Sequence, residues 1–183
     1  FNMKGIVIYK GKYGATKEYA IWLGAALGLP VIPVDGINGP ELREYDYLLL
    51  GTSVYIGKLQ VKKWLAKNIS FLAGRKVFLF QVAGTPQGEK EKRQLYNDDG
   101  VPKELAGNFE YYFLPGRMIM ENLSWKDRWM LKMGAWLTKD PVEKRNMMTN
   151  HDDVKKENLG EIIAGVKAFG QSLQERARVT LPV

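Results

Sequence analysis

The residues best suited to do chemistry lie in a short loop near the beginning of the sequence. This loop joins a β-branched run to a helical pattern and consists of Lys10, Gly11, Lys12, Tyr13, Gly14, Ala15 and Thr16. Its glycines allow a sharp turn and a close backbone approach to a ligand, and the Thr16 hydroxyl can cap the helix or bind an anion. Because helix N-terminal amides favour a phosphate, we expect a phosphate site here, with a plain turn capped by Thr16 as the alternative.

Two later loops carry residues that could hold a flat ligand beside that phosphate. The first contains Thr52, Ser53, Val54, Tyr55, Ile56 and Gly57, and the second contains Ala83, Gly84, Thr85 and Gly88. The Tyr55 ring can stack on a planar ligand, and Gly57 allows the backbone to rearrange next to it. The second loop offers backbone hydrogen-bond donors to the polar edge of such a ligand. The alternative for Tyr55 is an exposed side chain in a surface loop.

The sequence argues against several other kinds of site. It has no cysteine, which excludes thiolate nucleophiles and cysteine-bound zinc or iron–sulfur clusters, and a single histidine cannot build a multi-histidine metal site. We expect that histidine, His151, to be a surface residue before a helix. The first loop lacks both the Walker ending and the third glycine of the dinucleotide fingerprint. We therefore assign no catalytic side chain and no metal ligand, and expect a bound cofactor to supply the chemistry.

Strands that alternate with helices must position these loops. Strands are predicted at residues 4–9, 31–34, 45–51, 76–82 and 109–114, and helical patterns at 19–27, 61–72, 89–96, 124–137 and 154–175, with a break at 97–100. This order predicts an α/β fold, a five-stranded parallel sheet with helices on both faces. Such sheets bind ligands beyond the carboxyl ends of their strands, where all three loops lie.

Length, composition and charge indicate one cytoplasmic domain. The chain has 183 residues, of which 45% are hydrophobic, and no apolar run approaches a membrane span. We treat residues 1–183 as a single domain, with residues 1–2 as a remnant before Met3 and residues 115–150 as an insertion. The net charge of +7 favours anionic partners, but the basic residues form no nucleic-acid-binding motif, so we expect no nucleic-acid partner.

The three loops resemble those of flavodoxins. The ending Gly14-Ala15-Thr16 is similar to their phosphate loop, although flavodoxins carry hydroxyl residues at the positions of Gly11 and Tyr13. The segment from Gly51 to Gly57 resembles their loop over one face of the isoalloxazine ring. The resemblance implies a flavodoxin-like fold with FMN as cofactor, and the single short phosphate loop favours FMN over FAD or a nicotinamide dinucleotide.

A finer resemblance is carried by the stretch from Leu114 to Asn150. It is similar to the menaquinone-dependent protoporphyrinogen IX dehydrogenases, which have an additional helix after the fifth strand. The matching residues are Asp127, Arg128, Met130, Lys132 and Met133. The resemblance implies an FMN-dependent oxidoreductase of heme biosynthesis that oxidises a porphyrinogen and passes electrons to a quinone. A flavodoxin-type electron carrier and an interaction module without cofactor remain alternatives.

The additional helix has an apolar arc of its own. At 100° per residue, one side carries Leu123, Trp125, Trp129, Met130, Met133, Trp136 and Leu137. We expect this arc to meet a small-molecule substrate or the inner face of a membrane, because tryptophan, methionine and nearby cations suit such contacts; an ordinary packed helix is the alternative. Arg117, Lys126 and Arg128 could pair with substrate carboxylates, or form a solvated face.

Overall fold

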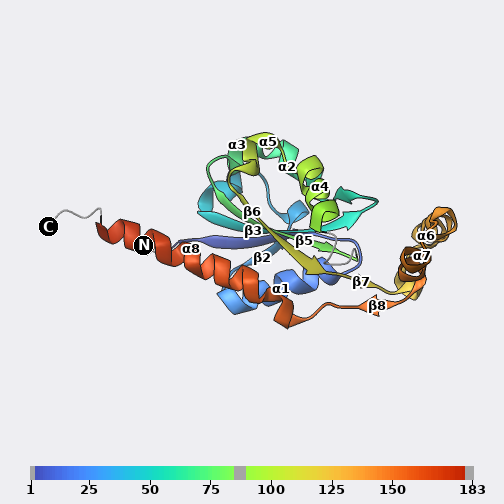
Figure 1. The fold of residues 1–183 in the computed structure, drawn as a ribbon. Helices are drawn as coiled ribbons and strands as arrows, with labels where there is room; N and C mark the ends of the chain where they lie inside the picture. Colours follow the sequence, from blue (N-terminus) through green and yellow to red (C-terminus); the bar gives the residue numbers. More distant parts are fainter. Residues whose placement is uncertain (1–2, 85–89, 180–183) are drawn as a thin grey trace.

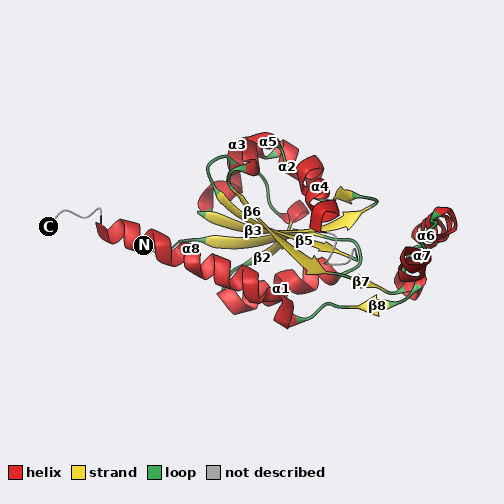
Figure 2. Cartoon of the chain, in the orientation of Figure 1, coloured by secondary structure: helices red, strands yellow, loops and turns green. Residues whose placement is uncertain are grey.

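Five parallel strands form the centre of the protein, in the order β2-β1-β3-β5-β6. The computed structural model describes residues 3–84 and 90–179, drawn in Figures 1 and 2. The strands are β1 (Gly5–Lys10), β2 (Val31–Pro33), β3 (Tyr47–Tyr55), β5 (Lys76–Ala83) and β6 (Phe109–Pro115). The short strand β4 (Lys58–Leu59) pairs antiparallel with the end of β3. The predicted α/β fold class with a five-stranded parallel sheet is confirmed, and Pro33 lies on an edge strand, where proline interrupts no pairing on its outer side.

The central strands are buried on both faces. Within β1, Ile6 and Ile8 belong to one hydrophobic cluster, whereas Val7 belongs to the other. The same alternation occurs in β3 and β5, because successive side chains of a strand point to opposite faces. Continuous apolar runs such as these are typical of parallel strands covered by helices on both sides.

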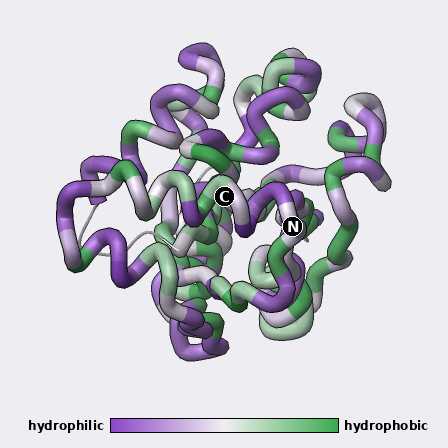
Figure 3. The backbone as a smooth tube through the Cα atoms, turned by 90° about the vertical axis from the view of Figure 1, so that its right-hand side faces the viewer, coloured by the Kyte–Doolittle hydropathy of each residue, from purple (hydrophilic) through white to green (hydrophobic). Residues whose placement is uncertain are grey.

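Helices cover both faces of the sheet (Figure 1). One face carries α1 (Ala15–Leu27) and α8 (Gly160–Val179), which contribute Tyr19, Leu23, Ile162 and Val166 to the core. The other face carries α2 (Lys62–Lys67), α3 (Ile69–Leu72), α4 (Lys90–Gly100) and α5 (Lys103–Ala106). Hydrophobic and hydrophilic stretches alternate along the chain (Figure 3), as expected for helices with one buried face. The connections include the 3₁₀ turns η1 (Val34–Gly36), η2 (Pro40–Glu44) and η4 (Lys156–Leu159).

Several predicted boundaries are wrong, and the helix predicted at 61–72 is divided into α2 and α3. The third strand continues to Tyr55, since Val54 and Tyr55 pair with β4 in a tight hairpin, so most of the expected loop at 52–57 is strand. The expected break at 97–100 lies inside α4, where Asn97 bonds to Gln81 and Asp99 pairs with Lys62. The last helix begins at Gly160 rather than at residue 154, after η4.

A helical arm follows β6. It comprises β7 (Arg117–Met118), η3 (Met120–Asn122), α6 (Trp125–Leu137), α7 (Pro141–Met148) and β8 (His151–Asp152). Strands β7 and β8 pair antiparallel at its base, and α6 and α7 extend beyond the end of the sheet (Figure 1). Within residues 3–84 and 90–179, no helix combines the length and the apolar character needed to cross a bilayer.

Candidate functional site

A small cavity of about 120 Å³ lies at the carboxyl ends of the central strands. It is bounded by the loop after β1, the end of β3, the end of β5 and the segment after β6. Its lining residues are Lys12, Tyr13, Ala15, Thr16, Ser53, Val54, Tyr55, Val82, Ala83, Gly84, Gly116 and Arg117. This is the edge of the sheet at which an open α/β fold binds its ligand.

The predicted phosphate loop is built as a turn into α1. Gly14 has φ 88°, a left-handed conformation that favours glycine, and the helix begins at Ala15 with no side-chain cap. Thr16 therefore lies inside the first helical turn, and the alternative of a plain turn capped by Thr16 is wrong. Instead, the Thr16 Oγ1 atom is buried and has no hydrogen-bond partner within the described part of the chain. A Cβ at Gly11 would lie 2.7 Å from that Oγ1 atom, so a glycine is required for Thr16 to pack there.

The second predicted loop contributes from the hairpin that ends β3. The Ser53 Oγ atom is buried and, like Thr16 Oγ1, has no partner among the residues that the structure describes. Tyr55 is half-buried at the strand end, and Ile56 and Gly57 make the turn with φ values of 50° and 65°. Buried hydroxyls are normally hydrogen-bonded, so two unpaired ones that line one cavity indicate that the site is shaped for a polar ligand.

These residues fit the FMN that the flavodoxin resemblance implies. Thr16 and the N-terminus of α1 offer donors to a phosphate, and the Tyr55 ring lies beside the same cavity. Ser53 offers a second hydroxyl in the same cavity. Ala83 and Gly84 line the cavity as predicted, whereas Thr85 and Gly88 lie outside the described residues.

Asp127 of α6 contacts both the loop after β1 and the hairpin that ends β3, a contact that no local pattern in the sequence predicts. Its carboxylate accepts hydrogen bonds from Lys12 Nζ at 2.6 Å, from Tyr55 Oη at 2.5 Å and from Tyr13 Oη. Lys12 and Tyr13 belong to the phosphate loop and Tyr55 to the hairpin of β3, so one side chain of the arm joins the two loops. The side chain is buried, with the residue only 5% exposed.

The charges in this contact stabilise one another. Burial alone would raise the pKa of Asp127, but the hydrogen bonds from Lys12, Tyr13 and Tyr55 outweigh it and lower that pKa to about 2. The same contact with Asp127, followed by the one with Tyr55, raises the pKa of Lys12 above its ordinary value. Lys12 Nζ also lies 4.0 Å from the centroid of the Tyr55 ring, a cation–π distance. The ammonium group is therefore firmly charged and fixed beside the aromatic ring.

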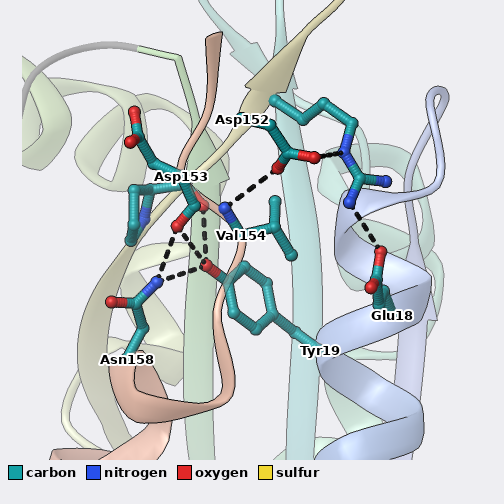
Figure 4. A network of polar contacts seen from close by, with 8 residues as sticks. Glu18, Tyr19, Asp152, Asp153, Val154 and Asn158 are labelled. Atoms are coloured by element: carbon teal, nitrogen blue, oxygen red, sulfur yellow. Dashed lines mark hydrogen bonds and ion pairs between the residues drawn. The ribbon is translucent and has the colours of Figure 1, made fainter.

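Arg117 lines the cavity and already has two carboxylate partners. It donates to Glu18 on α1 at 2.9 Å and to Asp152 on β8 at 2.7 Å, and the bond to Asp152 is the main cause of its raised pKa. Figure 4 shows the surrounding network, in which the Tyr19 hydroxyl donates to Pro115 O and accepts from Asn158. These contacts attach the base of the arm to α1. The expectation that Arg117 meets a substrate carboxylate stays a prediction.

Several of the remaining predicted residues lie outside the cavity. Thr52 is buried but bonds to backbone groups of Ser53 and Val61, and Lys10 pairs with Asp35, so neither lines the cavity. On the arm, Trp125, Lys126, Arg128 and Trp129 are all exposed, whereas Leu123, placed with them on the apolar arc, is buried. The expected surface residue His151 is half-buried in β8.

A buried arginine, which the sequence pattern did not single out, fixes the strand ends below the cavity. Arg93 of α4 is fully buried and donates to Gln81 O at 3.0 Å and to Leu114 O at 2.6 Å, which joins β5 to β6. Desolvation lowers the pKa of its guanidinium to about 10, well above neutral pH, so the group remains charged. Its hydrogen bonds hold in place the strand ends from which Val82, Ala83 and Gly116 reach the cavity.

Comparison with known proteins places the chain in a family. The chain is similar in structure to a flavodoxin from the domain Archaea, with 19% identity, a TM-score of 0.43, and coverage of 70% of this chain and 90% of that one. It is also similar to two-electron reduced Megasphaera elsdenii flavodoxin, with 20% identity, a TM-score of 0.47, and coverage of 61% of this chain and 85% of that one. Oxidised flavodoxin 1 from Bacillus cereus is similar as well, with 18% identity, a TM-score of 0.43, and coverage of 72% of this chain and 95% of that one. No curated protein sequence matches. The model of the flavodoxin domain matches residues 6–145, most of the chain, and the protein therefore belongs to the flavodoxin-domain family.

Proposed function

We propose that this protein binds FMN in the cavity at the strand ends and works as an oxidoreductase, with a porphyrinogen-type small molecule as electron donor and a quinone as acceptor. Membership of the flavodoxin-domain family supports the cofactor. The observation that carries the proposal is the pair of buried hydroxyls of Thr16 and Ser53, which line one cavity beside Tyr55 and have no hydrogen-bond partner among the described residues. The substrate and the acceptor rest on the resemblance of the stretch from Leu114 to Asn150.

Two residues of the cavity have roles that follow from their positions. Thr16 would donate a hydrogen bond from its hydroxyl to the phosphate group at the N-terminus of α1, where the helix dipole favours negative charge. Tyr55 would cover one face of the flavin ring, and Asp127, which accepts a hydrogen bond from the Tyr55 hydroxyl, would keep the tyrosine ring in its orientation. When bound, FMN accepts two electrons from a donor and releases them singly or in pairs.

The cofactor part of the proposal is tested with the apo-protein and a matched pair of variants. FMN added to the wild type should produce a bound flavin spectrum, and Thr16→Val should weaken that binding, since valine has the shape of threonine without its hydroxyl. Thr16→Ser is the control, because it keeps the hydroxyl and should bind nearly as well as the wild type. Wild-type protein that binds no FMN would contradict the proposal.

The reaction is tested separately on the FMN-loaded protein. Protoporphyrinogen IX and a soluble menaquinone analogue are supplied together, and formation of protoporphyrin is followed by its fluorescence. Turnover that requires both the protein and the quinone supports the dehydrogenase. Tight FMN binding without turnover would instead indicate an electron carrier, the function of the flavodoxins to which the chain is similar.

A further inference from the structure

Helix α6 exposes its most apolar side to solvent. We call this side the tryptophan face, and it consists of Trp125, Trp129, Met130, Met133, Trp136 and Leu137. Every one of these residues is exposed, with 76% of Trp125 and 78% of Trp136 accessible. Large apolar residues clustered on one surface usually mark an interaction site rather than chance exposure.

The opposite side of α6 does the packing. At 100° per residue, Asp127, Leu131, Gly134 and Ala135 lie across the helix from the tryptophan face. Asp127 and Ala135 are buried, Leu131 and Gly134 are partly buried, and Gly134 lies beside Met147 of α7. The helix therefore packs on the protein through one polar, two small and one aliphatic residue, and its tryptophans are exposed on the other side. This orientation is the reverse of that in an ordinary surface helix.

Cations lie within the tryptophan face and along one of its edges. Between residues 124 and 148 the sequence has six lysines and arginines and three acids. Two of the acids have basic partners, since Asp127 binds Lys12 and Glu143 lies 3.8 Å from Lys92. Lys126, Arg128 and Lys132 are exposed on α6 itself, with Lys126 Nζ 5.7 Å from the Trp125 ring centroid. Aromatic rings bordered by exposed cations match the boundary between anionic headgroups and acyl chains.

We propose that the tryptophan face docks onto an anionic lipid membrane, with α6 lying in the plane of the interface. A second copy of this chain is the less favourable occupant. A two-fold contact through the same face would place Lys126 and Lys132 of both copies near one another in a surface that excludes water, and like charges repel there. The lipid surface instead offers negative charge to the same lysines.

Docking in this orientation would bring the cofactor cavity close to the lipid. Asp127, on the side of α6 away from the tryptophan face, binds Tyr55 and the phosphate loop. Only the helix itself, about 10 Å in diameter, therefore separates those loops from the docked surface. A lipid-dissolved acceptor could then reach the cavity without leaving the membrane. Lipid binding itself requires no cofactor, so its test is independent of the proposed reaction.

The test is co-sedimentation of the full chain with two kinds of vesicle, phosphatidylcholine alone and phosphatidylcholine mixed with phosphatidylglycerol. The wild type should bind the mixed vesicles more tightly, should lose binding as salt is added, and should show a blue shift in tryptophan fluorescence. The double variant Trp125→Ser/Trp136→Ser should bind about tenfold more weakly or worse, because two large apolar contacts are removed. The matched control is Ile21→Ser/Leu95→Ser, which removes two exposed apolar side chains from α1 and α4 and should bind like the wild type.

Three results would overturn the proposal. The first is a wild type that binds neither kind of vesicle. The second is a tryptophan variant that binds vesicles as tightly as the wild type. The third is a wild type that forms a dimer instead of binding vesicles, together with a tryptophan variant that is monomeric. If the tryptophan variant does not fold, Lys126→Glu/Lys132→Glu provides the second test. It leaves the aromatic residues in place and should lose the preference for phosphatidylglycerol; an unchanged preference would contradict the proposal.

Discussion

Replacement of Asp127 by asparagine removes the charge that joins the arm to the cofactor loops while preserving the size of the side chain. Asparagine can still accept a hydrogen bond through its carbonyl oxygen. It cannot neutralise Lys12, and its amide group would face donors rather than acceptors. We expect Asp127→Asn to weaken the attachment of α6 to the phosphate loop and to the end of β3.

The size of the effect follows from the pKa of Asp127, which is the more buried partner of the ion pair. That pKa falls from its ordinary value of 3.8 to about 2 on folding. At about 1.4 kcal/mol per pKa unit, the ionised carboxylate contributes at most about 2.5 kcal/mol, within the net value of about 1.5–3 kcal/mol for hydrogen bonds to a charged group. Lys12 retains access to water, with 35% of its side chain exposed, and water weakens the ion pair. We therefore expect the variant to lose somewhat less, about 2 kcal/mol.

The effect should depend on pH in a defined direction. The folded-state pKa of Asp127 lies below its unfolded-state value, so its contribution is complete above about pH 4 and disappears as the pH falls toward 2. About half of it should be gone at pH 3. The difference between the wild type and Asp127→Asn should shrink accordingly.

Hydrogen exchange of the α6 amides is the appropriate assay, because the lost contact attaches the arm rather than the sheet. At pH 7, Asp127→Asn should exchange about 30-fold faster at residues 125–137, the equivalent of about 2 kcal/mol. Amides of β1 and β5 should change much less. Asp140→Asn on α7 is the control, since that exposed carboxylate caps its own helix. Equal protection of α6 in the wild type and in Asp127→Asn would refute the reasoning.

The other predictions concern the cofactor and the core. Thr16→Val should weaken FMN binding by about 1–3 kcal/mol and riboflavin binding much less, because riboflavin lacks the phosphate; calorimetric titration with both ligands checks this, and equal losses would mean that Thr16 is structural. The apo-protein should bind FMN more tightly than FAD in the same titration, and a preference for FAD would contradict the single phosphate loop. Arg93→Met should lower the free energy of unfolding in urea by about 3 kcal/mol or more, since it leaves the buried oxygens of Gln81 and Leu114 without donors. A loss below about 1 kcal/mol would contradict that assignment.

The parallel sheet could be predicted because its strands are continuous apolar runs separated by helical patterns. Ile6 to Ile8 and Val77 to Phe80 are buried on both faces, and such runs suit few other structures. The cavity loops could be predicted for the same reason, since they follow these strands. The end of β3 was missed because its pairing with β4 depends on a two-residue turn with positive φ at Ile56, a conformation uncommon for a β-branched residue.

Asp127 and Arg93 show what local sequence cannot provide. Asp127 is 115 residues from Lys12 and 72 from Tyr55, and no periodicity relates one position to another across such separations. Arg93 lies in a charged stretch that is typical of a solvated helix, and only the packing of α4 on the strand ends reveals its burial. In α6 the helical period correctly grouped the aromatic residues, but a period gives no information about which side of a helix faces the protein.

The stem formed by β7 and β8 makes the arm a removable module. The chain leaves and re-enters the body at one point, where Asp153 N donates to Gly116 O at 3.3 Å. A gene that joined Gly116 to Asp153 would therefore encode the sheet and its surrounding helices without the arm, and each strand would keep its neighbours. The reverse event, a single insertion at this joint, would give an ancestral flavodoxin both its outward aromatic surface and the carboxylate that reaches its cofactor loops. The same joint could receive a different module, so the surface next to the cavity could be exchanged there without altering the sheet.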